Sequence, residues 1–436
     1  MSEEGITYLL WQDLVGVTRT RGVPTRDLSK RMAHGLGWAR AGQALTAFGN
    51  IVDNPWGPMD EARQVPDPAT VFTIPATGDA PDFHAVICDS LLDDGSPWPC
   101  APRSFYRSAL DALQAETGLT LMASFEHEFS VTGADFTPSA PFSIGAVLQQ
   151  NRFLTELESA LTHAGVKTYT VEPEYGVGQY EVACAPETGL KAGDVCVITR
   201  EIIREIARRH GLTATFTPKP AADAVGNGAH VHFSLVDEAG HNRTYDPDGP
   251  MQLSSVAAHF SAGILAHVDA LLALTAPVPV SYFRLGPHHW STGYCAIGLQ
   301  NREAALRVTP GLGSERERAR GHNIEYRPCD GTASPYLVLG ALIFAGLDGI
   351  RRKLACPAGI TVDPAEMSDA ARAEAGVKLL PTSLASSLDA LLADDEACAW
   401  FDREALDLYV GLKRWEVEAA ATGGEADTFA RYRQAY

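Results

Sequence analysis

The sequence has few of the features that mark membrane, secreted or disulfide-linked proteins. Its eight cysteines contain no Cys-x-x-Cys pair and no regular spacing, so we expect reduced thiols in a cytoplasmic protein. No stretch approaches the roughly 18 uncharged apolar residues of a membrane span. The acidic start at residues 1–5 is followed by no apolar run, so we expect no signal peptide.

Positive charge is also scarce. The chain has 35 Lys and Arg residues against 54 Asp and Glu residues, for a formal net charge of −19. This balance argues against a nucleic acid or an acidic membrane surface as a partner. It does not exclude an anionic nucleotide, because a local cluster of arginines and metal ions can reverse the sign.

What is present is the composition of an ordinary globular protein, with 45% hydrophobic and 20% charged residues. A chain of 436 residues is too long for one simple core, so we expect two domains, at 1–100 and 101–436. The first is predicted to be a small α+β module, with strands at 7–23 (two, around a turn), 71–74 and 85–88 and a helix at 24–45.

Helices and short strands alternate through the rest of the chain, after an Asp-, Gly- and Pro-rich run at 89–102 that is typical of a linker. The apolar spacing predicts helices at 104–117, 149–164, 191–210, 253–274 and 336–353. Strands are predicted at 121–131, 169–183 (two, around a glycine turn), 229–236, 299–308 and 323–327. Several strand pairs are joined by tight turns, which favours antiparallel pairing and an α+β fold.

The strand predicted at 121–131 carries two glutamates, Glu126 and Glu128. Side chains two apart on a strand share a face, so these residues lie about 6.6 Å apart along the backbone. Carboxylates this close repel unless water or cations separate them. A solvated strand face explains the pair taken alone, but further acidic residues along the chain favour a metal site.

Six acidic and histidine residues on predicted strands next to glycines form a plausible ligand set for hard divalent cations. They are Glu126, Glu128, Glu174, Glu181, His230 and Glu325. Oxygen-rich sites suit Mg²⁺ or Mn²⁺ better than zinc. Taken singly, each residue also has an ordinary structural explanation, such as a turn glutamate or a hydrogen-bonded histidine.

A second group is basic and lies in an apolar, glycine-rich segment. It consists of Arg284, Arg302, Arg307, Arg320 and Arg327. Arginines often cover a surface without any further role, but their planar fork also suits carboxylate and phosphate. Metal-binding carboxylates together with phosphate-binding arginines indicate phosphoryl transfer from a nucleotide.

The ordered motifs resemble the glutamine synthetase superfamily. They are Glu126-His-Glu128, Glu174-Tyr-Gly-Val-Gly-Gln-Tyr-Glu181, Asn227-Gly-Ala-His-Val-His-Phe-Ser234, Ser281-Tyr-Phe-Arg-Leu285, Asn301-Arg-Glu-Ala-Ala-Leu-Arg307 and Ile324-Glu-Tyr-Arg327. The resemblance covers residues 103–436, with a weaker match before them. It implies an N-terminal β-grasp-like domain and a catalytic domain with a curved antiparallel sheet flanked by helices.

The resemblance also assigns roles. Glu128, Glu174 and Glu181 match the ligands of the metal nearer the amino-acid substrate, and Glu126, His230 and Glu325 match the ligands of the metal that bridges the ATP phosphates. Arg284 and Arg327 match arginines that bind glutamate, and Gly226 and Gly228 match the loop beside it. Arg302 and Arg307 match residues that hold the transferring phosphate, Arg320 matches a further phosphate-binding position, and His232 and Ser234 lie on the nucleotide side.

The implied reaction uses ATP to phosphorylate the γ-carboxylate of L-glutamate, after which an amine displaces the phosphate. Arg302, Arg307, Glu325 and Arg327 are the residues expected to act directly on the reacting groups. The resemblance implies about two to three Mg²⁺ (or Mn²⁺) ions per site. It further implies a homo-oligomer of stacked rings, a decamer or dodecamer.

Two departures bear on the acceptor. After Leu285 the sequence reads Gly-Pro-His-His-Trp-Ser, so Trp290 stands where family members that use ammonia have a glutamate that takes its proton. An indole cannot act as a base, although His288 or His289 could. The aspartate of the small domain that helps to bind ammonium also has no clear counterpart, with Asp53 the nearest candidate. We therefore expect an organic amine that contacts Trp290.

Three alternatives to this amine ligase stay open: an ammonia-dependent glutamine synthetase with a rebuilt flap, a phosphotransferase without ligation, and a non-catalytic relative. The segment at 379–381 lacks the tyrosine that some bacterial members modify with a nucleotide. That form of regulation is therefore not expected.

Overall fold

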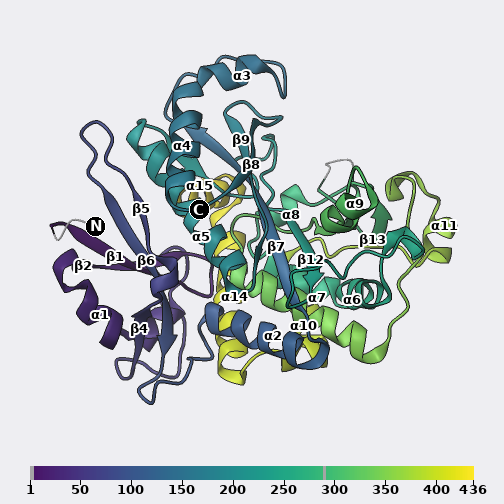
Figure 1. The fold of residues 1–436 in the computed structure, drawn as a ribbon, viewed down its shortest axis with the longest axis horizontal. Helices are drawn as coiled ribbons and strands as arrows, with labels where there is room; N and C mark the ends of the chain where they lie inside the picture. The colour runs from purple at the N-terminus through teal and green to yellow at the C-terminus, as the bar shows by residue number, and fades with distance from the viewer. Residues whose placement is uncertain (1–3, 288–290) are drawn as a thin grey trace.

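The computed structural model describes residues 4–287 and 291–436 (Figure 1). Its first sheet has six strands in the order β2-β1-β6-β4-β3, with β5 paired to β6. The strands are β1 (Ile6–Gln12), β2 (Thr18–Pro24), β3 (Leu36–Ala39), β4 (Glu61–Pro66), β5 (Phe72–Ile74) and β6 (Phe83–Leu91). The predicted strand pair at 7–23 is confirmed as β1 and β2.

The helix predicted over 24–45 is wrong beyond its second turn. The only α-helix there is α1 (Leu28–His34), and it ends because Gly35 adopts a positive φ of 62°. The chain then continues as β3, which pairs with β4. The linker predicted at 89–102 is shorter than expected, because β6 runs to Leu91 and the next helix starts at Pro102.

The second sheet has ten strands in the order β16-β13-β14-β15-β12-β7-β9-β8, with β10 and β11 also paired to β7. They are β7 (Thr120–Thr132), β8 (Thr168–Pro173), β9 (Gln179–Cys184), β10 (Glu187–Thr188), β11 (Thr213–Thr215), β12 (Val231–Val236), β13 (Tyr294–Leu299), β14 (Ala304–Thr309), β15 (Asn323–Tyr326) and β16 (Lys378–Leu379). Along β7, buried side chains alternate with half-buried ones.

The expected antiparallel pairing holds through most of this sheet, but β13 and β14 pair in parallel. The single strand predicted at 299–308 is therefore wrong: Leu299 ends β13 and a turn with Gln300 at a φ of 57° precedes β14. The four polar residues Gln300–Glu303 form this turn, and they interrupt the apolar pattern between the two strands.

Helices flank both sheets and fill the space between them (Figure 1). Besides α1 they are α2 (Pro102–Thr117), α3 (Ile144–Gln149), α4 (Asn151–His163), α5 (Leu190–Arg209), α6 (Ser255–Ala266), α7 (Val268–Thr275), α8 (Ser281–Arg284), α9 (Glu315–Gly321), α10 (Pro335–Arg352), α11 (Asp369–Glu374), α12 (Leu384–Ala393), α13 (Asp395–Ala399), α14 (Arg403–Gly423) and α15 (Glu425–Ala435). The apolar helix α10 is buried and packs against α2, α6 and α7.

The helix predicted at 253–274 is divided into α6 and α7, which meet at a 76° bend. In the described part of the chain no single helix is long and apolar enough to cross a membrane. Among the described helices, only this bent pair, taken together, has the length and apolar composition of a span. Most of its side chains are buried in the protein core.

Buried polar contacts join the two sheets' domains. Arg103 at the start of α2 is 5% exposed and pairs with Asp67 and Asp89 of the first domain and with Asp194 of α5. The hydroxyl of Tyr436 donates to the carbonyl of Val15 over 2.6 Å. These contacts hold the first domain against the helices that support the second sheet.

Candidate active site

The second sheet places carboxylates side by side on three neighbouring strands. Glu128 of β7 lies opposite Glu181 of β9, and Glu181 lies opposite Glu172 of β8. Directly paired residues on antiparallel strands point to the same face. Glu174 follows the end of β8 by one residue, and its pKa is raised in part by the charge of Glu128. The structure thus brings the predicted ligands Glu128, Glu174 and Glu181 together.

Glu126 meets both predicted histidines across the β7–β12 pair. His230 Nδ1 lies 3.2 Å from one carboxylate oxygen of Glu126, and His232 Nε2 lies 3.0 Å from the other. Glu325 of β15 completes the group, with an oxygen 3.5 Å from His230 Nδ1 and 3.9 Å from His232 Nε2. Six residues predicted from distant parts of the sequence therefore converge on one end of the sheet.

This group fits a divalent cation. Ligand atoms of Glu126, His232 and Glu325 lie within 4.8 Å of one another, and His232 Nε2 faces a carboxylate oxygen of Glu126 at 3.0 Å. The resemblance assigns His230 to the metal and His232 to the nucleotide. In the structure both imidazoles reach the carboxylates. The side-chain oxygen of Asn323 lies 2.8 Å from His232 Nδ1, so Nε2 is the nitrogen directed toward Glu126 and Glu325, where a metal would be held.

The charges in this group hold one another ionised. Burial opposes the charge of Glu126, but hydrogen bonds from His230 and His232 outweigh it and hold the pKa of Glu126 well below its usual range. Burial likewise lowers the pKa of His232, yet the bond and charge of Glu126 outweigh burial and raise it to about 8. Without a bound cation, an imidazolium therefore balances the carboxylate at neutral pH, and a metal held by His232 would displace this proton.

Among the described residues, 4–287 and 291–436, neither histidine nor arginine pairs with Glu174 or Glu181. Burial, followed by the charge of Glu128, raises the pKa of Glu174 to about 7. Burial, followed by the charges of Glu126 and Glu128, raises the pKa of Glu181 to about 10. Carboxylates forced together in this way favour a proton or a cation between them.

Two of the five predicted arginines contact the acidic group directly. Arg307 of β14 and Arg327, which follows β15, both donate to the carboxylate of Glu325. Glu325 is 0% exposed and Arg327 1% exposed, so this is a desolvated ionic cluster. Burial opposes the charge of Glu325, but the two arginines and two histidines outweigh it and lower its pKa.

The other arginines are placed differently. Arg284 is buried in α8 and donates to the backbone oxygens of Arg327 and Cys329. Arg302 is exposed, and its backbone oxygen accepts from Arg327 Nε over 2.8 Å. Arg320 is exposed in the last turn of α9.

The predicted glycine loop borders the same space. The backbone N–H of Gly228 donates to Glu128 Oε2 over 2.8 Å. A Cβ on Gly226 would lie 2.7 Å from the side chain of Arg284, so that position needs a glycine. Ser234 is buried and its hydroxyl donates to the backbone oxygen of His322, so the structure brings it to β15 rather than to the acidic group.

Gln179 joins the glycine loop to the turn between β8 and β9, and the sequence reasoning did not single it out. Its side-chain oxygen accepts from Gly176 N over 2.8 Å, and its Nε2 donates to Gly226 O over 2.7 Å and to Asn227 Oδ1 over 2.9 Å. Only its place inside the Gly178-Gln-Tyr-Glu181 motif could have drawn attention to it.

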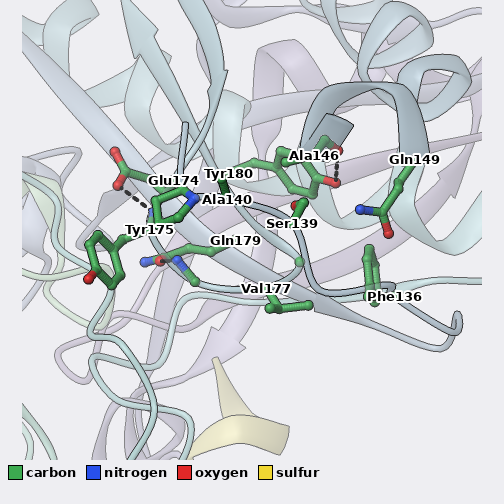
Figure 2. A pocket seen from close by; sticks show the side chains of 13 residues that line it. Phe136, Ser139, Ala140, Ala146, Gln149, Glu174, Tyr175, Val177, Gln179 and Tyr180 are labelled. Atoms are coloured by element: carbon green, nitrogen blue, oxygen red, sulfur yellow. Dashed lines mark hydrogen bonds between the residues drawn. The ribbon is translucent and has the colours of Figure 1, made fainter. Parts of the chain in front are cut away.

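A narrow pocket lies behind that turn. It is lined by Phe136, Ser139, Pro141, Gln149, Glu174 and Tyr175, among others. Glu174 and Tyr175 are at one side of it and Phe136 and Gln149 at the opposite side (Figure 2). Trp290, His288 and His289, expected near the acceptor, lie outside the described residues. Asp53 is exposed on the loop before β4.

Comparisons with known proteins agree with this geometry. The glutamine synthetase N-terminal domain matches residues 4–98, and the glutamine synthetase catalytic domain matches residues 99–432. The gamma-glutamylpolyamine synthetase GlnA3 of Streptomyces coelicolor is 34% identical over 396 residues, which cover 88% of this chain and 84% of the relative. The glutamine synthetase of Methanocaldococcus jannaschii is 31% identical, with 86% and 82% covered.

Solved structures agree as well. One described as a novel glutamine synthase homolog superposes with a TM-score of 0.92 at 37% identity and covers 100% of this chain and 99% of that one. A complex of GmaS with ADP gives a TM-score of 0.83 at 26% identity, with 96% and 94% covered. The chain therefore belongs to the glutamine synthetase family and is an ATP-dependent carboxylate–amine ligase.

Proposed function

We propose that this ligase joins the γ-carboxylate of L-glutamate to an organic amine through a γ-glutamyl phosphate. The observation that carries the proposal is the convergence of two charged groups: a row of carboxylates on β7, β9 and β8, and Arg307 and Arg327 around Glu325. A site with both can neutralise phosphate oxygens and receive a positively charged amine.

The site residues have separate roles in this reaction. Bound Mg²⁺ or Mn²⁺ supplies charge neutralisation for the transferring phosphate, with Glu126, His230, His232 and Glu325 on one side and Glu128, Glu174 and Glu181 on the other. Arg307 and Arg327 hold phosphate and carboxylate oxygens in place. Arg284 and the backbone of Gly226 and Gly228 form the wall against which glutamate lies. Water must be kept from the acyl phosphate, which otherwise hydrolyses.

An organic amine is favoured over ammonia on three grounds. The carboxylate that family members use to deprotonate ammonium is replaced by Trp290 in the sequence. Among the relatives, one of 34% identity is named as a polyamine ligase. The chain's own carboxylates at Glu172, Glu174 and Glu181 suit a cationic acceptor.

The test is phosphate release from ATP with Mg²⁺ and L-glutamate, with ammonium and with a panel of alkylamines, ethanolamine, diamines and anilines. Release that depends on an amine supports the ligase. Strong release with ammonium alone would make the protein a glutamine synthetase, and release without any amine would indicate a phosphotransferase. No phosphate release with any acceptor would favour another acid substrate or a non-catalytic protein.

The proposal includes a cytoplasmic enzyme assembled into stacked rings, a decamer or dodecamer. Mass by light scattering, together with negative-stain images of the particles, tests the ring. A monomer at micromolar concentration would contradict it.

A further inference from the structure

Three carboxylates form a straight row across the sheet, and the ligand set predicted from the sequence uses only two of them. Glu128, Glu181 and Glu172 are paired in register across β7, β9 and β8. Neighbouring strands lie about 4.8 Å apart, and like charges directly opposite one another destabilise a sheet. Three carboxylates in line therefore favour a proton or a cation between them.

Within residues 4–287 and 291–436, neither Glu181 in the middle of the row nor Glu172 at its β8 end has a partner. Glu181 is 8% exposed, so about nine-tenths buried, and no hydrogen bond or ion pair reaches its side chain, which points into the row. Glu172 is half-buried and equally free of arginine, lysine and histidine partners. A buried carboxylate without a donor is costly unless a ligand supplies one.

Glu172 lies beyond the predicted metal ligands. Glu128 and Glu181 belong with Glu174 to the metal nearer the amino-acid substrate, whereas Glu172 is on β8, the last strand of the sheet. Its charge adds to those that raise the pKa of both Glu174 and Glu181. It therefore extends the negative field from the metal site toward the sheet edge, about one strand spacing away.

An exposed aromatic pair lies at the turn that follows β8. Tyr175, directly after Glu174, is 57% exposed, and Phe142 is 50% exposed. Their ring centroids lie 6.3 Å apart in an edge-to-face arrangement. Figure 2 shows Tyr175 on the same side of the pocket as Glu174. Aromatic faces beside carboxylates accommodate alkylammonium groups, because the ring attracts the cation and covers the methylenes.

We propose that Glu172 binds the distal ammonium group of a diamine or polyamine acceptor, and so sets the preference for acceptors with two charged nitrogens. The inference rests on the proposed function and names its acceptor class. The nitrogen that attacks the acyl phosphate must be unprotonated, whereas the distal nitrogen stays an ammonium throughout. Glu172 can therefore hold the acceptor without interfering with the reacting nitrogen.

The experiment compares 1,4-diaminobutane with n-butylamine, which has the same carbon chain and one nitrogen. The variants are Glu172→Gln, which removes the charge at constant shape, Glu172→Asp, which keeps the charge and shortens the reach, and Glu158→Gln. Glu158 is an exposed glutamate of α4 and serves as the matched control. Turnover is followed by phosphate release, and binding by the rise in melting temperature.

For Glu172→Gln we expect KM for the diamine to rise at least about tenfold, as for loss of a charge-assisted hydrogen bond, with KM for butylamine within about twofold of the unaltered enzyme. Glu172→Asp should recover part of the loss, and Glu158→Gln should change nothing. The affinity for Mn²⁺, measured by electron paramagnetic resonance, should be the same in every variant.

An equal change in KM for both amines, or no change in either KM, would overturn the inference. A loss of Mn²⁺ affinity would also overturn it, because Glu172 would then be a metal ligand. The binding measurement separates this inference from the proposed function. If the diamine stabilises the unaltered protein and not Glu172→Gln while no amine is turned over, the proposed ligation is wrong and the acceptor site stands. If the diamine stabilised the unaltered protein and Glu172→Gln equally, the assignment of Glu172 to the acceptor site would be wrong.

Discussion

The backbone N–H of Gly228 donates to Oε2 of Glu128 over 2.8 Å. This bond ties a predicted metal ligand to the loop beside the amino-acid substrate. A Cβ on Gly228 would lie 3.1 Å from Arg284 Nη2, Glu128 Oε1 and His230 Nε2, so metal ligands and substrate arginine meet at this one position.

Gly228→Ala should therefore weaken Mn²⁺ binding and raise KM for glutamate by about tenfold each, as displacement of supporting contacts does at metal sites. Both are measured by titration. Gly411→Ala is the control, because Gly411 lies in α14 with open space around it and alanine favours a helix by roughly 1 kcal/mol. Unchanged affinities in Gly228→Ala would show that the loop tolerates the methyl group.

Glu128→Ala should abolish turnover and leave the fold intact, because the substitution removes a half-buried ligand and no core group. Circular dichroism and the melting temperature check the fold, and phosphate release checks turnover. Glu158→Ala, a surface change of the same size, should be fully active. Full activity in Glu128→Ala would refute the metal assignment.

Arg327→Met should destabilise the protein treated with a chelator by about 3 kcal/mol, because it leaves the buried carboxylate of Glu325 with one arginine fewer. Denaturant unfolding measures the change. Mg²⁺ should restore part of the loss, since a bound cation neutralises Glu325. Arg318→Met, at an exposed arginine of α9, should cost little, and equal losses in both variants would contradict the prediction.

Cation binding should strengthen as pH rises from 6 to 8. The pKa of Glu174 is raised to about 7 and that of Glu181 to about 10, so at pH 6 protons occupy groups that must be ionised to bind a metal. Mn²⁺ binding should release protons, detected by calorimetry in two buffers of different ionisation enthalpy. Glu174→Gln should flatten the dependence between pH 6 and 8; an unchanged slope would argue against Glu174 as a ligand.

The same raised pKa values predict how the protein without added metal responds to pH. Above the unfolded value of 4.5, the unfolded chain loses these protons more readily than the folded one. The free energy of unfolding should therefore fall from about pH 4.5 upward, first until Glu174 ionises in the folded state near 7 and then, less steeply, until Glu181 ionises near 10. Unfolding by denaturant at several pH values, with and without Mg²⁺, measures it.

Strand periodicity predicts which candidate ligands share a face, but it does not predict every boundary of the scaffold. The shared face of Glu126 and Glu128 follows from strand periodicity, and β7 has the alternation that this requires. The helix predicted over 24–45 ends at Gly35, where a positive φ stops α1, and a helical pattern of apolar residues does not reveal such a stop.

Cross-strand neighbours could not be predicted. Glu172 faces Glu181 only because of the register that the turn between β8 and β9 sets, and no periodicity within β8 contains that information. Asn323 reaches His232 for the same reason: it lies on β15, which pairs with β12. Local patterns indicate which face a side chain is on, whereas pairing partners depend on long-range contacts.

Gln179 binds Gly176 in the β8–β9 turn and Gly226 in the substrate loop through one side chain. Two ligands that each order one of these segments cannot act independently. If the metal makes glutamate bind more tightly by some factor, glutamate must make the metal bind more tightly by the same factor. The amide of Gln179 thus gives the enzyme a means of reciprocal cooperativity, in which each substrate component raises the affinity for the other.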